Sequence, residues 1–574
     1  MPGPDGAWGQ ALVDAVRAGE VDEKDIDRKV RRILRLAVRV GALDGFERVE
    51  PAGASDAQTL LALTRQAARD GMVLLANDGT LPLGRPRTVA VIGEGARFAR
   101  VQGGGSATVI PEFVVSPLDG LRERFPDAEI TWSLGSVVQQ GLAPLPVGTF
   151  CTPEGDPGLL VRYLDPDGVE TGREVRTSSW LVWFNGESQA GAADVVEFSF
   201  TYTPEVSADS FDLGVGGLAD VEVLVDGDRV GAAEVRTKPG DDPATVVLNP
   251  PFTSVVVPSP TGSANVVVRF RPVAGGMPDA LALRVGSTPD ASDADELIAA
   301  AVAQAAAADV AIVVVSTSNE VESEGFDRVT LALPGTQDEL VRAVARACSR
   351  TVVVVNSGAP VTLPWRTEVS AVLATWFPGQ EFGHALADVL SGDVEPGGRL
   401  PVSWPAAESD VPVRDVTPTD GRLDYSEGIH IGYRAWDKVG GRPAFPFGHG
   451  LGYTSWGLDA LSVAPWTERG TSATVAVTNA GDRTGKFVVQ LYAERDSSSG
   501  VERPRRWLVG FEAGHLAPGA RTTATIPLPW RRFAHWADGS WAVEPGAFRL
   551  VAALSCAHDG PSSVILVGER GSAQ

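Results

Sequence analysis

Two stretches in which helical and β-like segments alternate flank a long stretch that is β-like throughout. The apolar, β-branched runs at 88–93 and 310–315 are typical of strands buried on both faces of a parallel sheet. Between about 140 and 288 helical periodicity fades, and short alternating runs with tight turns replace it. The sequence therefore predicts one open α/β domain that is interrupted by an inserted β-sandwich.

The segments at the two ends of the chain differ in kind. Residues 26–40 place apolar side chains at steps of three and four, which predicts a helix with one apolar face. Such a short helical segment cannot form a core alone, so we expect it to pack on something larger. After the loop at about 405–455, alternation resumes at 473–478 and 487–492 and predicts a terminal immunoglobulin-like sandwich.

Composition limits the partners. The chain has 574 residues, enough for three or more domains, and its 49 basic and 73 acidic residues give a net charge of −24. This charge repels phosphate backbones and anionic lipids, so we expect no nucleic-acid partner and no membrane association. The three cysteines lie far apart and indicate no disulfide framework, which favours a reducing, cytoplasmic location.

Four carboxylates and an arginine follow the run at 310–315 directly. Ligands of open parallel sheets bind beyond the carboxyl ends of the strands, so the segment from Ser316 to Arg328 is the first candidate site. Clustered carboxylates raise one another's proton affinity, as a general acid near neutral pH requires. An exposed acidic loop held by a contact between Asp327 and Arg328 is the structural alternative, and these residues alone leave it open.

Other motifs are weaker signals. Residues 93–98 begin like a dinucleotide fingerprint but place Phe98 where the third glycine belongs, and 102–107 lack the Lys-Ser/Thr ending of a P-loop. The six histidines show no zinc-type spacing, so we expect no metal and no cofactor. Trp180 and Trp183 could stack on a sugar ring, although their alternating spacing favours a place in the core.

The segment Ser323-Glu324-Gly325-Phe326-Asp327-Arg328 resembles the acid/base loop of glycoside hydrolase family 3, the β-glucosidase family. Further motifs that resemble the family follow in the family's order along nearly the whole chain, at 1–4, 103–107, 331–337, 356–361, 376–381, 397–401, 425–428 and 445–451. The segment at about 158–284 is similar to the protective-antigen-type sandwich that some members insert. Residues 508–519 resemble part of the family's fibronectin type III-like domain.

The resemblance implies a multidomain fold of α/β and all-β parts. The expected parts are C-terminal helices of a truncated (β/α)8 barrel with a linker (1–50), the two halves of an open α/β sandwich domain (51–138 and 291–406), an inserted protective-antigen-type β-sandwich (139–290), a linking loop region (407–457) and a fibronectin type III-like β-sandwich (458–574).

The resemblance also implies a reaction. The family releases non-reducing terminal β-D-glucosyl residues by a retaining mechanism, in which one carboxylate attacks the anomeric carbon and another protonates the leaving oxygen. Glu324 takes the acid/base place, with Glu320 and Glu322 as rival carboxylates, while Asp327 and Arg328 are expected to brace the loop. The expected ligand is a β-glucoside or a short oligosaccharide, and no substrate-binding residue is assigned.

The chain departs from the family in one respect. Full-length members begin with a barrel that carries the nucleophilic Asp, and its Ser-Asp-Trp type motif is absent from the 574 residues. We therefore expect the isolated chain to be inactive, and a separate barrel chain is a candidate partner. A non-catalytic carbohydrate-binding or scaffold protein is the alternative function.

Overall fold

The computed structural model describes most of the chain, which divides into two compact units, Met1–Leu63 and Thr64–Gln574. The described residues are 8–46, 56–146, 148–184, 193–203, 210–238, 240, 243–258, 263–277, 280–289, 292–324, 327–414, 416–495 and 500–568.

The first unit contains two helices, α1 (Gln10–Arg17) and α2 (Glu23–Arg39). The carboxylate of Asp22 caps α2 by accepting the N–H of Lys24 at 2.9 Å, which satisfies one of the unpaired donors at the helix start. The helix expected at 26–40 is therefore present as α2. Its apolar face is exposed, with Ile33 67% and Leu36 61% exposed. That these helices belong to a barrel stays a prediction.

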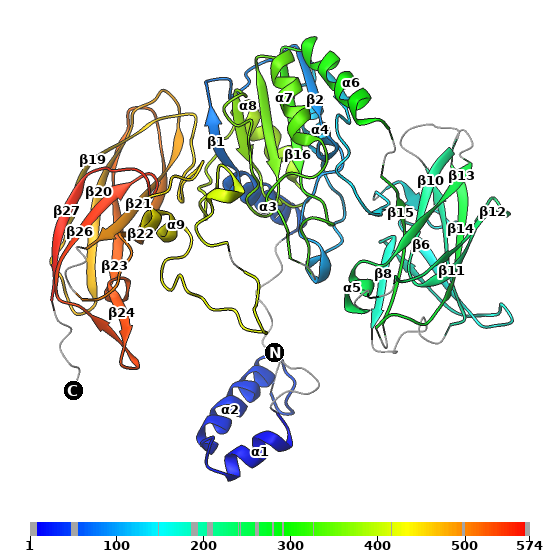
Figure 1. Ribbon diagram of the computed structural model, residues 1–574, viewed down its shortest axis with the longest axis horizontal. Helices are drawn as coiled ribbons and strands as arrows, with labels where there is room; N and C mark the ends of the chain where they lie inside the picture. Colours follow the sequence, from blue (N-terminus) through cyan, green and yellow to red (C-terminus); the bar gives the residue numbers. More distant parts are fainter. Residues whose placement is uncertain are drawn as a thin grey trace. The chain divides into compact units, whose positions relative to one another are not determined.

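A six-stranded sheet forms the centre of the second unit (Figure 1). Strands from both sides of the β-rich segment join in it, in the order β1-β18-β17-β16-β2-β3, and β1 alone is antiparallel to its neighbour. The bounds are β1 (Val73–Asn77), β2 (Thr88–Ile92), β3 (Glu129–Ser133), β16 (Val310–Ser316), β17 (Thr351–Asn356) and β18 (Ala371–Ala374).

Helices cover both faces of this sheet. Because successive strand residues point to opposite faces, Ile312 packs in a core cluster with α4 (Pro117–Arg124) and α8 (Phe382–Ser391), and Val313 packs in a second cluster with α6 (Ala294–Ala306) and α7 (Gln337–Ala347). All seven residues of β16 are buried, which explains its continuous apolar sequence. Helix α3 (Ala57–Gly71) precedes β1.

The β-rich segment between β3 and α6 forms two packed sheets around one core. One sheet holds β13 (Phe252–Pro258), β10 (Ser210–Gly216), β15 (Ala280–Ser287), β4 (Ala143–Pro144) and β8 (Trp180–Phe184). The other holds β12 (Asp228–Val235), β11 (Ala219–Val225), β14 (Ala264–Pro272), β9 (Val195–Tyr202), β6 (Leu159–Leu164), β7 (Glu170–Arg176) and β5 (Phe150–Cys151). The short helix α5 (Pro243–Leu248) also lies in this segment. Trp183 is buried in the core of this segment.

A second sandwich follows helix α9 (Tyr433–Val439) and has a core of its own. Its sheets contain β19 (Trp456–Val463), β20 (Gly470–Asn479) and β23 (Arg521–Pro529) on one side, and β22 (Arg506–Leu516), β21 (Gly485–Glu494), β26 (Gly546–Ala553) and β27 (Ser562–Val567) on the other, with a small β24 (Ala534–Ala537) and β25 (Ser540–Val543) pair. The predicted mixture of α/β and all-β architecture is confirmed, while the domain boundaries stay predictions. Within the described residues, no helix has the length and apolar character needed to span a bilayer.

Candidate functional site

Loops that follow parallel strands meet at one edge of the central sheet. The acidic loop, residues 317–328, follows β16, and its Thr317 N–H donates to the carbonyl of Asn356 at the end of β17 at 3.2 Å. The carboxyl ends of parallel strands lie at the same edge, where ligands of such sheets bind. The residues Gly325 and Phe326 of the motif lie outside the described residues.

Arg100, in the segment after β2, organises the acidic loop. Its guanidinium lies over the ring of Phe377, 4.6 Å from the ring centroid. It donates to four acceptors of the acidic loop, namely Thr317 Oγ1 (3.2 Å), Ser318 O (2.9 Å), Asn319 Oδ1 (3.0 Å) and Glu322 O (2.9 Å). Burial lowers the pKa of Arg100, and the carboxylates of Glu322 and Glu320 oppose that shift. A planar fork with several donors suits this task better than a lysine would.

Asn356 joins the segment that contains Arg100 to the loop after β18. Its Oδ1 accepts the N–H of Arg100 at 3.0 Å, and its Nδ2 donates to the carbonyls of Arg100 at 2.9 Å and Trp376 at 2.6 Å. Trp376 has a φ of +57°, a conformation that costs energy for a residue with a side chain. The fully buried Asn356 amide therefore fixes the segments that follow two different strands, β2 and β18.

The carboxylate of Glu322 accepts two hydrogen bonds that hold the acidic loop in place. Its Oε2 accepts the hydroxyl of Thr317 at 2.8 Å and the backbone N–H of Gly358 at 3.0 Å. A carboxylate that accepts a hydroxyl and a backbone amide anchors the loop on the segment after β17.

Glu320 faces the segment that leads into the inserted sandwich. Its Oε1 would lie 2.5 Å from a Cβ placed on Gly141, so the acidic loop and the segment at Gly141 are in close contact there. Burial lowers the pKa of Arg284, on β15, to about 10, and the charge of Glu320 opposes that shift. The guanidinium of Arg284 lies 4.0 Å from the ring centroid of Trp180.

Glu324 is the exposed member of the three glutamates. It lies against Gly105, which has a φ of +74°, and a Cβ at that glycine would sit 2.6 Å from Glu324 Oε2. The neighbouring Gly104 approaches the side chain of Ser323 in the same way. Gly104 and Gly105 therefore permit a close approach of their backbone to the acidic loop.

Arg328 braces the far end of the acidic loop. It donates to three backbone carbonyls, those of Thr330 (2.7 Å), Pro360 (3.2 Å) and Ala332 (3.4 Å). Burial lowers the pKa of Arg328, and the carboxylates of Glu322 and Glu408 oppose that shift. Asp327 is exposed.

Sequence reasoning missed Arg100 and gave no role to Gln337. The amide of Gln337 accepts the N–H of Ser316 at 2.8 Å and donates to the carbonyls of Ser316 and Pro334, both at 2.9 Å. It thereby fixes the last residue of β16. The one sequence signal for Arg100 is its place just before the glycine-rich segment that follows a buried strand.

The segment that resembled a dinucleotide fingerprint has a structural task. Glu94 Oε2 accepts the N–H groups of Val138 at 2.6 Å and Gln139 at 3.2 Å, and so holds the chain that enters the inserted sandwich. Within the described part of the chain, no three His, Cys, Asp or Glu side chains are grouped so that they could hold a metal ion.

Comparison with known proteins identifies two regions of the chain. Residues 72–453 match the glycosyl hydrolase family 3 C-terminal domain, and residues 487–556 match a fibronectin type III-like domain. The first match includes the central sheet, the inserted segment and the acidic loop.

The chain is also similar to whole proteins. It is 37% identical to a beta-glucosidase of Rhizobium radiobacter over 97% of this chain and 68% of the relative. A crystal structure of a beta-glucosidase from Kluyveromyces marxianus in complex with glucose matches with a TM-score of 0.83 and 28% identity, over 99% of this chain and 70% of that one. A beta-glucosidase from Streptomyces venezuelae in complex with D-glucose matches with a TM-score of 0.68 and 31% identity, over 98% of this chain and 66% of that one.

These matches confirm the family resemblance of the acidic loop and of the motifs around it. The chain belongs to glycosyl hydrolase family 3, a family of glycoside hydrolases.

Proposed function

We propose that the chain is a β-glucosidase that releases terminal β-D-glucosyl residues with retention, and that Glu324 is its general acid/base. The observation that carries the proposal is the different placement of three glutamates on one loop. Glu322 is hydrogen-bonded to Thr317 and Gly358, Glu320 packs against the backbone of Gly141, and Glu324 is exposed at the carboxyl edge of the sheet. The names of the relatives support the substrate class.

In this proposal Glu324 acts twice. Its carboxylic acid first protonates the glycosidic oxygen while a second carboxylate attacks the anomeric carbon, and its carboxylate then takes a proton from the water that hydrolyses the glycosyl-enzyme. The pair of carboxylates must stand about 5 to 5.5 Å apart. Arg100 and Gly105 act as positioning residues, because they determine where the acidic loop and Glu324 lie.

The nucleophile completes the proposal. We infer that an Asp of a barrel domain supplies it, since the family's nucleophile motif is absent from these 574 residues. The isolated chain is then inactive, and a barrel supplied in the same chain or as a separate chain restores hydrolysis. The helices of 1–50 and the division into domains given above belong to this same proposal.

Hydrolysis of methyl β-glucoside, whose methanol must be protonated to leave, tests the proposal. The chain alone is compared with a barrel-completed chain, in which the barrel of the Rhizobium radiobacter relative precedes it. Glu324→Gln is expected to lower kcat/KM of the barrel-completed chain by about 10²- to 10⁴-fold, the usual contribution of a general acid. Glu320→Gln is the matched control and is expected to retain most of the activity. Hydrolysis by the bare chain would contradict the assignment of the nucleophile, and full activity of Glu324→Gln would contradict that of the acid.

A further inference from the structure

The hairpin of β24 and β25 carries two exposed tryptophans at one end of the terminal sandwich (Figure 1). Trp536 and Trp541 lie directly opposite each other on the two strands, and their exposed fractions are 61% and 40%. Exposed apolar side chains that adjoin one another mark interaction sites more often than scattered ones do. The hairpin is therefore a candidate binding site outside the acidic loop.

The turn of the hairpin determines how the two rings are placed. Asp538 and Gly539 form a two-residue connection with φ values of +50° and +75°, and Ala537 pairs with Ser540 across it. Asp-Gly is a favoured sequence for such turns, because both residues must adopt a positive φ. The local sequence thus fixes the register that brings Trp536 and Trp541 together.

The base of the hairpin is anchored in the sandwich. Phe533, just before β24, is fully buried in the core of this domain. Glu544, just after β25, forms ion pairs with Arg495 at 3.2 Å and with Arg503 at 3.4 Å, and the side chains of both arginines are about nine-tenths buried. A site that is fixed at both ends loses little conformational freedom when a ligand binds.

The two rings form an angled apolar surface with hydrogen-bond donors beside it. Their centroids lie 5.4 Å apart at an interplanar angle of 75°. The exposed guanidinium of Arg531 lies 4.4 Å from the ring centroid of Trp541. Rings at this angle cannot both lie flat on one planar surface, so they suit a single ligand chain better than the face of a crystalline polymer.

The border of this surface indicates the chemistry of the ligand. Its neighbours Arg531, Arg532, Asp538 and Ser540 are exposed and polar or charged. A stable protein interface buries about 800 Å² on each partner around an apolar core, which two rings in such surroundings do not supply. A sugar has an apolar C–H face that packs on a ring and a rim of hydroxyl groups that bond to polar neighbours.

We propose that the hairpin binds a single soluble β-glucan chain through Trp536 and Trp541. The choice of a β-linked glucan rests on the proposed function, whereas the match to a neutral sugar chain rests on the rings and their border. The hairpin shares no residue with the acidic loop, so its task is to retain the protein on a polymer. Hydrolysis of a small glucoside does not require it.

Affinity gel electrophoresis with mixed-linkage β-glucan in the gel tests this site. The parent is the full chain with Glu324→Gln, in which the proposed hydrolysis is blocked. Trp536→Leu removes the ring but keeps an apolar side chain, and we expect it to weaken binding by about three- to tenfold, the scale of an aromatic contact. Phe511→Leu is the matched control, because Phe511 is a 62% exposed aromatic residue on β22 of the same sandwich, and it is expected to leave binding unchanged. Neither substitution changes the net charge that drives migration.

A second variant guards against loss of folding. Trp536→Tyr keeps a ring in the cross-strand pair, and it is expected to retain most of the affinity at an unchanged unfolding midpoint. A parent whose migration glucan does not retard would overturn the proposal. So would a parent dimer in sedimentation velocity that Trp536→Leu separates into monomers, because the hairpin would then be an interface between two copies.

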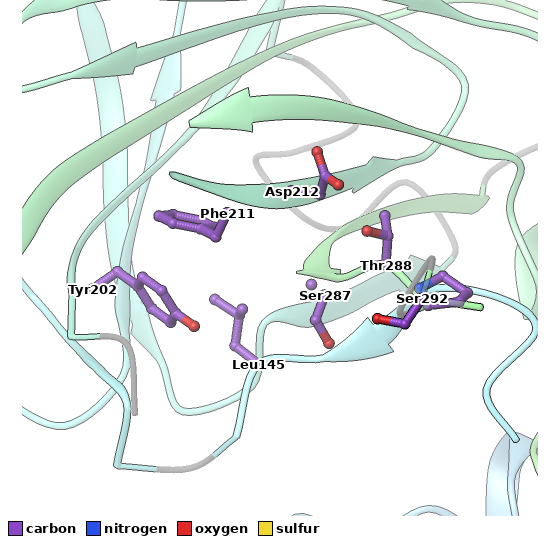
Figure 2. A pocket seen from close by; sticks show the side chains of 9 residues that line it. Leu145, Tyr202, Phe211, Asp212, Ser287, Thr288 and Ser292 are labelled. Carbon is purple, nitrogen blue, oxygen red and sulfur yellow. The ribbon is translucent and has the colours of Figure 1, made fainter. Parts of the chain in front are cut away.

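The inserted sandwich offers another place for a ligand, a cavity of about 550 Å³ whose wall includes the rings of Tyr202 and Phe211 (Figure 2). Glucan bound there would retard the parent and Trp536→Leu equally, and that result would overturn the proposal. Retardation that depends on Trp536, without hydrolysis of methyl β-glucoside by the barrel-completed chain, would support the hairpin site and contradict the proposed function. The reverse result would contradict the hairpin site alone.

Discussion

The carboxylate of Glu324 lies against the backbone of Gly105, so closely that a Cβ at this glycine would sit 2.6 Å from Oε2. The glycine also has a φ of +74°, which side-chain-bearing residues rarely adopt. Position 105 therefore affects where the proposed acid/base can lie.

Gly105→Ala is expected to displace Glu324. A misplacement of about 1 Å can cost about 10²-fold in rate, and we expect a loss of that order in kcat/KM of the barrel-completed chain. Gly103→Ala is the control, because a Cβ at Gly103 would meet no described atom within 4 Å. Equal activity of the two variants on methyl β-glucoside would show that this contact does not position the acid.

Arg100→Lys is expected to destabilise the acidic loop. A lysine cannot reach the four acceptors that the two terminal guanidinium nitrogens of Arg100 reach, and three of these acceptors are partly buried. The free energy of unfolding should fall by about 1 to 3 kcal/mol in urea titrations. Arg85→Lys changes an exposed arginine in the same half of the domain and should have no such effect. A stability equal to that of the parent would contradict the role of Arg100.

The carboxyl group of Glu395 is expected to make stability depend on pH. It packs against Gly452 and against Gly485 of the terminal sandwich, and burial raises its pKa to about 7, opposed by the charge of Arg399. A raised pKa means that the folded state favours the neutral acid. This contribution is therefore complete below the unfolded pKa of about 4.3 and is lost as the pH rises through about 7.

Glu395→Gln keeps a neutral group at this position. Above the raised pKa the variant is expected to be more stable than the parent by about 1 to 2 kcal/mol, a figure reduced for solvent screening of a partly exposed group. Urea titrations on both sides of neutrality measure the difference. Glu468→Gln, at an exposed position, is the control. A parent and a Glu395→Gln variant with parallel pH profiles would contradict this assignment.

The sheet and the position of the acidic loop could be predicted from the sequence, because both depend on patterns within short segments of the chain. A strand that is buried on both faces must be apolar throughout, as β16 is, and parallel strands place the loops that follow them at one edge. The apolar periodicity of residues 26–40 likewise indicated the helix that is now α2.

The roles of the three glutamates could not be separated from the sequence. Glu320 packs on Gly141, Glu322 accepts a hydrogen bond from Gly358, and Glu324 packs on Gly105, and these glycines come from three different loops. Arg100 and Thr317 are 217 residues apart, on opposite sides of the insert. Such contacts depend on how the fold brings distant segments together, and they cannot be predicted from the spacing of residues in the sequence.

The most direct test of Glu324 as acid/base compares two leaving groups on the Glu324→Gln variant of the barrel-completed chain. A 2,4-dinitrophenolate leaves without protonation, whereas the methanol of methyl β-glucoside needs the acid. We predict that kcat/KM falls by about 10²- to 10⁴-fold for methyl β-glucoside and changes little for 2,4-dinitrophenyl β-glucoside. Equal losses on the two substrates would contradict the role of Glu324 as the proton donor.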